Sequence, residues 1–207
     1  MPKVSDKHRE QRRQQILAAA LRCFARKGFH ETSMSEIIAE SGLSAGAIYG
    51  HFTGKSDLVA DAAAEVFSRN AEALHATRGS GGEPAHPLDF AAGITDSMIG
   101  TVGGSVLPLQ VWGEAVLDDD VRQVFDVVYG RLQVGIRSQI FLWLTEVKHL
   151  SAKQADSRVD TLTTVTLGLL QGGVVQSALV PKFDRGAYLR AAHPIFDTIP
   201  TTYPHSE

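Results

Sequence analysis

The sequence predicts an all-α protein of about nine helices. Apolar residues recur at three- and four-residue spacing along most of the chain. Glycines, prolines and helix-capping residues divide this pattern into separate segments. No segment shows the alternation of apolar and polar residues that a half-buried strand requires. We expect a small N-terminal domain at residues 1–54 and a larger helical domain at residues 55–207.

An apolar stripe over residues 16–24 predicts the first helix. This helix should end near Gly28, which follows two basic residues that suit the negative end of a helix. Ser33 and Glu36 have the spacing of a capping box, in which each side chain binds the backbone N–H of the other residue. The box predicts a short second helix at about 34–40.

Gly42 breaks the second helix, and Ser44 can cap a third one at about 45–52. A longer helix at about 56–77 should link the N-terminal domain to the rest of the chain. The segment "RGSGGEPAHP", residues 78–87, is a loop rich in glycine and proline. The remaining apolar patterns predict helices at about 88–101, 105–117, 118–149, 152–179 and 184–198.

The composition limits the classes of protein that the chain can belong to. It has 207 residues, 43% of them hydrophobic, which is enough for a buried core. Cys23 is the only cysteine, so an internal disulfide and a paired-cysteine zinc motif are excluded. The first residues, "MPKVSDKHREQRRQQ", are charged and lack the apolar core of a signal peptide. We therefore expect a cytoplasmic protein.

One uncharged segment is long enough to suggest a transmembrane helix. It runs from Thr161 to Pro181 and contains four threonines and two glutamines. Gly168 and Gly172 lie four residues apart, a spacing that lets two helices approach closely. We expect this helix to pack against other helices rather than cross a membrane.

Charge is distributed unevenly along the chain. Residues 1–60 hold nine basic and six acidic residues, a net charge of +3, whereas residues 61–207 hold eleven and seventeen, a net charge of −6. A basic N-terminal part on an acidic body can face a polyanion with that part alone.

The two short helices at about 34–40 and 45–52 are joined by a tight turn and form a helix-turn-helix candidate. Such a unit places the N-terminus of its second helix in the major groove of DNA. Ser44, Ala45 and Gly46 are small, so the exposed N–H groups of this helix end can approach phosphates and base edges.

Several polar residues around this helix end are candidate phosphate ligands, since such contacts position a protein on DNA. Thr32 suits either a contact with DNA or a cap at the start of the second helix. His51 suits either a contact or a solvated surface, and Phe52 suits the core. The full set of candidate DNA-binding residues is Thr32, Ser33, Ser44, Ala45, Gly46, Tyr49, His51 and Lys55.

The stretch "ILAAALRCFARKGFHETSMSEIIAESGLSAGAIYGHFTGKSDLV", residues 16–59, resembles the DNA-binding domain of the TetR family of bacterial regulators. The resemblance implies a homodimeric repressor that binds an operator in double-stranded DNA and has a divergent ligand-binding domain. It implies backbone contacts for Thr32, Tyr49 and Lys55. The sequence departs from the family at Ala45, where the family often has lysine, and at Ile38, where alanine is common.

The resemblance also implies that the last two long helices pair with those of a second subunit, with packing inside one subunit as the alternative. Suitable contact residues in the first of these helices are Leu167, Gly168, Leu170, Gly172, Val175 and Leu179. The middle helices are expected to enclose a pocket for a small, mostly apolar effector. Its candidate lining residues are Phe67, Phe90, Met98, Gln110, Trp112, Tyr129, Gln133 and Trp143.

Two other classes of protein compete with this hypothesis. An enzyme is not expected, because no metal-ligand motif and no nucleophile–base pair is visible among the eight histidines and the other polar residues. We expect no catalytic residue, no metal site and no cofactor. A helical bundle that binds proteins or small molecules without DNA is the alternative function.

Overall fold

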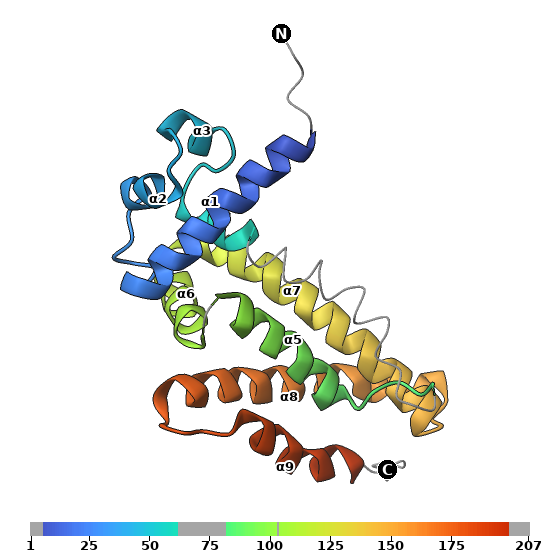
Figure 1. Cartoon of the computed structure of the whole chain (residues 1–207). Helices are drawn as coiled ribbons and strands as arrows, with labels where there is room; N and C mark the ends of the chain where they lie inside the picture. Colours follow the sequence, from blue (N-terminus) through green and yellow to red (C-terminus); the bar gives the residue numbers. More distant parts are fainter. Residues whose placement is uncertain (1–5, 62–81, 103, 199–207) are drawn as a thin grey trace. The chain divides into compact units, whose positions relative to one another are not determined.

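The computed structural model describes residues 6–61, 82–102 and 104–198, which form helices joined by turns (Figure 1). The all-α prediction is therefore confirmed. The described residues form nine helices and a further helical segment at 55–61, close to the predicted number of about nine. The helices are α1 (Asp6–Lys27), α2 (Met34–Ser41), α3 (Ala45–Tyr49), α5 (Pro87–Val102), α6 (Val106–Leu117), α7 (Asp119–Leu142), the π-helix η1 (Trp143–Val147), α8 (Ala152–Leu179) and α9 (Arg185–Asp197).

The chain divides into two compact units. The N-terminal unit comprises Met1–Ser68 and Met98–Tyr129, and the C-terminal unit comprises Arg69–Ser97 and Gly130–Glu207. Helices α5 and α7 therefore contribute residues to both units. The predicted domain boundary after residue 54 stays a prediction.

The core of the N-terminal unit is apolar and joins α1, α2, α3, the 55–61 segment and α6. Ile16, Ile37, Ile48 and Leu58 have no exposed surface. These side chains come from four different elements, so burying them fixes the elements against one another. The helix α3 has only five residues, too few to be stable alone, and Ile48 anchors it to this core.

The predicted ends of the first two helices are confirmed. Gly28, with φ of +86°, follows α1, and Gly42, with φ of +68°, ends α2 in the left-handed conformation that glycine adopts easily. The third helix is shorter than the predicted 45–52. It ends at Tyr49, and the chain then turns so that Phe52 is buried in the core.

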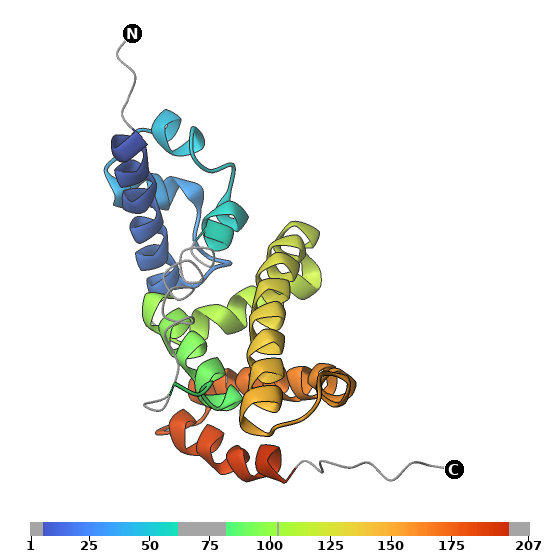
Figure 2. The ribbon, with the colours of Figure 1, turned by 90° about the vertical axis from the view of Figure 1, so that its right-hand side faces the viewer.

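The C-terminal unit contains the long helix α8, which packs on α9 (Figures 1 and 2). Ser151 and Gln154 cap α8 reciprocally, as the sequence predicts. Helix α9 is joined to α5 by two ion pairs, Arg185 with Asp96 and His193 with Asp89.

Two features of these helices need comment. By length and composition α8 could cross a membrane, but core helices of soluble proteins pass the same test, and its buried residues form a continuous face.

The predicted helix 118–149 ends in the π-helix η1, where the Lys148 N–H donates to the Trp143 carbonyl. The wider turn places Trp143 and Leu144, which are adjacent in sequence, in buried positions.

Candidate nucleic-acid interface

The turn between α2 and α3 is held by side chains as well as by backbone. The Ser41 hydroxyl donates to the Ile38 carbonyl at 2.9 Å and accepts from the Leu43 N–H at 3.2 Å. The Gln15 side chain of α1 donates to the Ser41 carbonyl at 2.9 Å. The turn between α2 and α3 is therefore stabilised by its own hydrogen bonds and by a side-chain hydrogen bond from α1.

The N-terminal end of α3 is exposed and almost without side chains. Ser44 caps the helix by accepting from the Ala47 N–H, and Ser44, Ala45 and Gly46 are all exposed. A Cβ added at Gly46 would meet no atom of the protein within 4 Å, so packing inside the protein does not require glycine there. Gly46 keeps the helix end thin on its outer side, where another molecule can approach the N–H groups of the first turn.

Tyr49 stands on the same short helix and is 52% exposed, which is high for so large a side chain. Its neighbour Ile48 is fully buried. Tyr49 thus projects from a fixed helix, and its ring leaves the hydroxyl few positions to occupy. His51 is half-buried in the turn after α3, beside the Phe52 ring.

Thr32 and Lys55 hold the turn that follows α1. The Thr32 side chain is 1% exposed, and its hydroxyl donates to the Gly28 carbonyl at 2.7 Å. The Lys55 ammonium donates to the carbonyls of Phe29 at 2.9 Å and His30 at 3.0 Å, and it lies over the Phe29 ring. Both side chains therefore have a structural role at the edge of the candidate interface.

Ser33 forms the predicted capping box at the start of α2. Its hydroxyl accepts from the Glu36 N–H, and the Glu36 carboxylate accepts from the Ser33 N–H at 2.9 Å. The Glu36 carboxylate also pairs with the Lys27 ammonium. These hydrogen bonds, led by that of Lys27, lower the pKa of Glu36 to about 2.

The charged residues of α1 fall into two groups. Arg13 pairs with Glu10 and Asp61, and Arg22 and Arg26 both pair with Glu40. Within the part of the chain that the structure describes, three cations at the N-terminal end of α1, namely Lys7, Arg9 and Arg12, make no ion pair.

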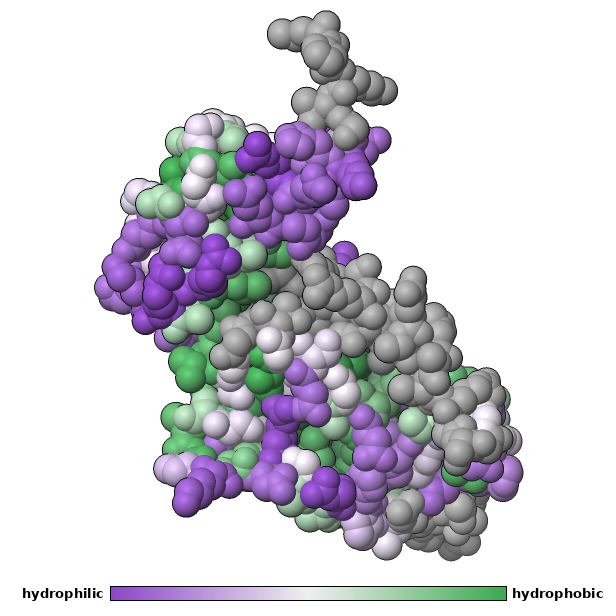
Figure 3. Space-filling model, viewed as in Figure 1, coloured by the Kyte–Doolittle hydropathy of each residue, from purple (hydrophilic) through white to green (hydrophobic). Residues whose placement is uncertain are grey.

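The three cations belong to the end of α1 that lies near α3. Figures 1 and 2 show α3 and the N-terminal end of α1 at the same end of the N-terminal unit. Hydrophilic side chains cover α1 in Figure 3, and paler, less polar residues surround α3. Sequence reasoning noted the basic N-terminal part but did not single out these residues, because counting charges does not show which ones are paired.

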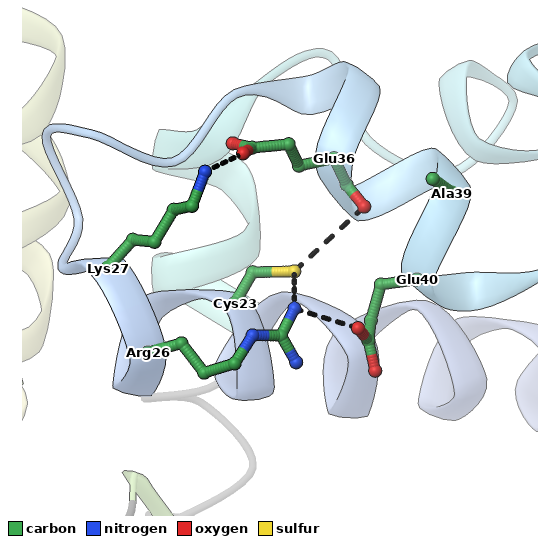
Figure 4. A pocket seen from close by; sticks show the side chains of 6 residues that line it. All are labelled: Cys23, Arg26, Lys27, Glu36, Ala39 and Glu40. Carbon is green, nitrogen blue, oxygen red and sulfur yellow. Dashed lines mark hydrogen bonds and ion pairs between the residues drawn. The ribbon is translucent and has the colours of Figure 1, made fainter.

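A groove of about 360 Å³ lies between α1 and α2 (Figure 4). Its charged side chains are paired with one another across the groove, Lys27 with Glu36 and Arg26 with Glu40. Cys23 at its base is buried, and burial raises the pKa of its thiol. The groove thus has a structural explanation: its ion pairs join α1 to α2.

Gln110 of α6 supports the turn after α1, a contact that sequence reasoning missed. Its side-chain oxygen accepts from the Phe29 N–H at 2.9 Å, and a Cβ added at Gly28 would lie 2.6 Å from its nitrogen. Glu114, one turn later on α6, lies 3.5 Å from the His30 ring. The two partners of the Gln110 hydrogen bond are 81 residues apart, so no local pattern announces it.

Comparison with known proteins matches the segment that contains this short exposed helix and the two helices that hold it. Residues 16–62 match the model of the "Bacterial regulatory proteins, tetR family". The N-terminal part of this chain is similar to that family. The TetR-family segment is 39% identical over 74 residues to the transcriptional repressor AcnR of Corynebacterium diphtheriae, an alignment that covers 36% of this chain and 39% of that repressor.

Solved structures with a similar fold cover most of the chain. The FadR regulator of Bacillus subtilis, in complex with stearoyl-CoA, has a TM-score of 0.64 at 16% identity, covering 89% of this chain and 97% of that one. A protein from Saccharomonospora viridis in complex with choline has a TM-score of 0.64 at 21% identity, covering 92% and 97%. At such identities the likeness concerns the fold.

The predicted pocket residues are divided between the two units. In the N-terminal unit, Gln110 lines a cavity of about 350 Å³ beside Gly28, and Tyr129 stacks on Phe125. Met98 and Trp112 are half-buried there. In the C-terminal unit Phe90 and Trp143 are buried and Gln133 is exposed, while Phe67 lies outside the described residues. The pocket as a whole stays a prediction.

The six predicted dimer residues occupy two faces of α8. Leu167 and Leu170 are 2% and 3% exposed, so they pack inside the subunit. Gly168 is exposed and Leu179 is 70% exposed. Gly172 and Val175 are half-buried, and a Cβ at Gly172 would lie 3.1 Å from the Tyr188 hydroxyl of α9. A face that remains available to a second subunit therefore contains Gly168 and Leu179.

Proposed function

We propose that this protein is a TetR-like transcriptional repressor of the cytoplasm, which binds a palindromic operator as a homodimer and is released by a small, largely apolar ligand. One observation carries the proposal. The N-terminal end of α3 is exposed and bare, whereas Ile48 holds the helix in the core. A helix presented in this way suits the major groove of duplex DNA.

The exposed residues divide the work of binding. Ser44, Ala45 and Gly46 face the bases and the nearest phosphates, and Tyr49 donates its hydroxyl to the backbone. Lys55 uses two of its three N–H donors on the turn after α1, which leaves one for a phosphate.

Ser33 and His51 are further polar side chains near the same helix end, and Thr32 orders the turn through its buried hydroxyl. The unpaired cations at the start of α1, Lys7, Arg9 and Arg12, contribute attraction that salt weakens.

The dimer follows from the DNA. A palindrome offers two half-sites about one helical turn apart, and reading both requires two copies of α3. Exposed apolar residues of the last two helices, Val165, Leu179 and Ile195, are the surface that a second copy would cover. This use of α8 in a subunit interface accounts for its low charge without a membrane.

The ligand class is drawn from the fold and its neighbours. The solved relatives named above hold choline and stearoyl-CoA, two unlike small molecules. In this chain the effector would be recognised by the predicted pocket residues, among them Phe90 and Trp143. Release requires that the ligand bind the DNA-incompetent arrangement of the dimer more tightly than the competent one.

The direct test is selection of bound fragments from random duplex DNA by the full chain, followed by fluorescence anisotropy on the selected duplex. We expect a palindrome and an affinity that falls steeply as salt increases. Selection of no sequence, together with equal weak binding to every duplex at low salt, would contradict the proposal.

A matched pair of variants tests the bare helix end. Gly46→Leu adds a side chain where the protein has open space, so the fold should persist while operator affinity falls at least about tenfold. Gly113→Leu also adds a side chain in open space, but on α6 instead of α3, and should leave affinity unchanged. If both variants bind DNA like the original chain, α3 does not approach DNA through Gly46.

A further inference from the structure

Three side chains from distant parts of the sequence meet in the C-terminal unit. His86 precedes α5, Asp89 lies in the first turn of α5, and His193 lies in α9. One ligand atom from each lies within 4.8 Å of the others. We propose that His86, Asp89 and His193 bind a divalent transition-metal ion, with Zn²⁺ as the best match to two imidazoles and one carboxylate.

The geometry of the His193–Asp89 pair favours an ion over a shared proton. Nε2 of His193 lies 3.0 Å from Oδ1 of Asp89, yet this nitrogen is buried and makes no hydrogen bond, because its N–H direction does not point at the oxygen. Two ligands of one tetrahedral Zn²⁺ ion at about 2.1 Å each are about 3.4 Å apart, so the two atoms need to separate by about 0.4 Å, and the ion lies off the line that joins them.

His86 can supply the third ligand atom through either of its ring nitrogens. The His86 ring stacks on the His193 ring, with centroids 4.0 Å apart, and its Nδ1 accepts from the Leu88 N–H at 3.2 Å. Binding through Nδ1 replaces this hydrogen bond, and binding through Nε2 moves the ring proton to Nδ1. Either route gives up one neutral hydrogen bond for a metal–ligand bond. The stacked rings of His86 and His193 must also move apart before both can bind the same ion.

The surroundings suit a structural ion. Trp143 and Phe196 pack edge-on against the His86 ring at centroid distances of 5.3 and 5.8 Å. These aromatic side chains limit the access of water to one side of the site. Asp89 is partly exposed, which gives the ion a path of entry and a position for a bound water molecule.

A metal ion here would fasten α9 to α5. Arg185 and Asp96 already join the two helices at one point, and His193 and Asp89 join them about two turns away. Because 96 follows 89 on α5 while 185 precedes 193 on α9, the two helices run antiparallel. The ion would convert the second link from an ion pair into three metal–ligand bonds.

The test uses the full chain without a polyhistidine tag, stripped with EDTA. Titration with Zn²⁺ in a calorimeter should show one site per chain and a raised melting temperature that EDTA reverses. Co²⁺ should give visible absorption bands from a nitrogen- and oxygen-coordinated ion. Absence of a stoichiometric site for either ion would overturn the proposal and leave His193 and Asp89 as an ordinary ion pair.

Three variants locate the site. His193→Phe keeps an aromatic ring in the stack, and Asp89→Asn keeps the shape of the side chain, so both should fold and both should bind Zn²⁺ at least tenfold more weakly. His149→Ala removes an exposed histidine of the same unit and should bind Zn²⁺ like the original chain. Equal affinity in all four proteins would place the ion elsewhere and overturn the assignment.

An optical signal inside the cluster gives an independent readout. In a Trp112→Phe background Trp143 is the only tryptophan, and it touches the His86 ring. Co²⁺ should quench its fluorescence at one equivalent, and His193→Phe should abolish this quenching. Quenching that persists in His193→Phe would contradict the proposed ligand set.

Discussion

Buried hydroxyls are hydrogen-bonded in both compact units, as Thr163 and Thr166 show in the C-terminal one, but the two units differ in their buried side-chain nitrogens. In the N-terminal unit the buried hydroxyls of Thr32 and Ser41 both donate to backbone carbonyls. In the C-terminal unit Arg158 is 7% exposed, and its Nε and Nη1 atoms have no hydrogen-bond partner. His193 likewise has a buried nitrogen that makes no hydrogen bond.

An unpaired buried donor is costly, since it has lost its hydrogen bonds to water and gained none in return. In the described part of the N-terminal unit, the buried hydroxyls of Thr32 and Ser41 are satisfied by that unit's own backbone. The C-terminal unit retains donors that an added ligand or ion would satisfy. The difference makes the C-terminal unit the better place to test for an added ligand or ion.

The largest effect is expected from breaking the apolar core of the N-terminal unit. Ile37 has no exposed surface, so Ile37→Ala should lower the free energy of unfolding by about 2–5 kcal/mol. Val134 of α7 is 65% exposed, and Val134→Ala should change the free energy of unfolding by no more than about 0.5 kcal/mol. Urea denaturation measures both, and similar losses would show that burial does not distinguish the two sites.

The second test concerns Arg158 and has the opposite sign. Arg158→Met replaces the unpaired guanidinium with an apolar side chain, which should raise the free energy of unfolding by about 1–3 kcal/mol in the absence of ligand. Arg137→Met, a change of an exposed arginine paired with Asp160, is the control and should have little effect. A loss of stability in Arg158→Met would mean that the guanidinium has a partner in solution, and the contrast between the units would weaken.

A smaller effect is expected at the turn after α1. Gly28 has φ of +86°, a conformation that costs other residues about 1–2 kcal/mol, and a Cβ there would also collide with Gln110. Gly28→Ala should therefore lower stability, and a second change, Gln110→Ala, should relieve the collision but not the backbone strain. A double-mutant cycle followed by denaturation separates the two contributions. Additive losses would show that the Gln110 side chain moves aside freely.

The local features of the N-terminal unit were predictable because their causes lie close together in sequence. The Ser33–Glu36 capping box, the left-handed Gly42 and the Ser44 cap all follow from residues within a few positions of each other. The end of α3 was predicted three residues too late, since burial of Phe52 rather than helix propensity decides where the chain leaves the helix.

Contacts between distant residues could not be predicted in this way. Gln110 supports Phe29 across 81 residues, and His193 meets Asp89 only when α9 folds back on α5. For the same reason, the sequence could not show which of the six predicted dimer residues of α8 are buried and which are exposed. Spacing places Leu167 and Gly168 next to each other, but only packing shows which of them faces the core.

The last prediction tests the ion pairs that close the surface of the N-terminal unit. The hydrogen bonds of Glu36 to Lys27 and Ser33 lower its pKa from an ordinary value of 4.5 to about 2. Because the folded value is the lower one, these contacts stabilise the fold fully above about pH 4.5 and lose their effect as the pH falls toward 2. The urea midpoints of the original chain and of Glu36→Gln should therefore differ by a constant amount near neutral pH and converge between pH 4.5 and 2.

Salt should narrow the same difference, since the pair is exposed to solvent. Glu31→Gln, at an exposed glutamate without an ion pair in the described part of the chain, corrects for the removal of one carboxylate. A gap between the original chain and Glu36→Gln that stays constant down to pH 2 would assign the contribution of Glu36 to its capping geometry and not to its charge. The start of α2 would then depend on the hydrogen bonds of its capping box and not on the Lys27–Glu36 ion pair, which would sharpen its contrast with the unpaired buried guanidinium of Arg158.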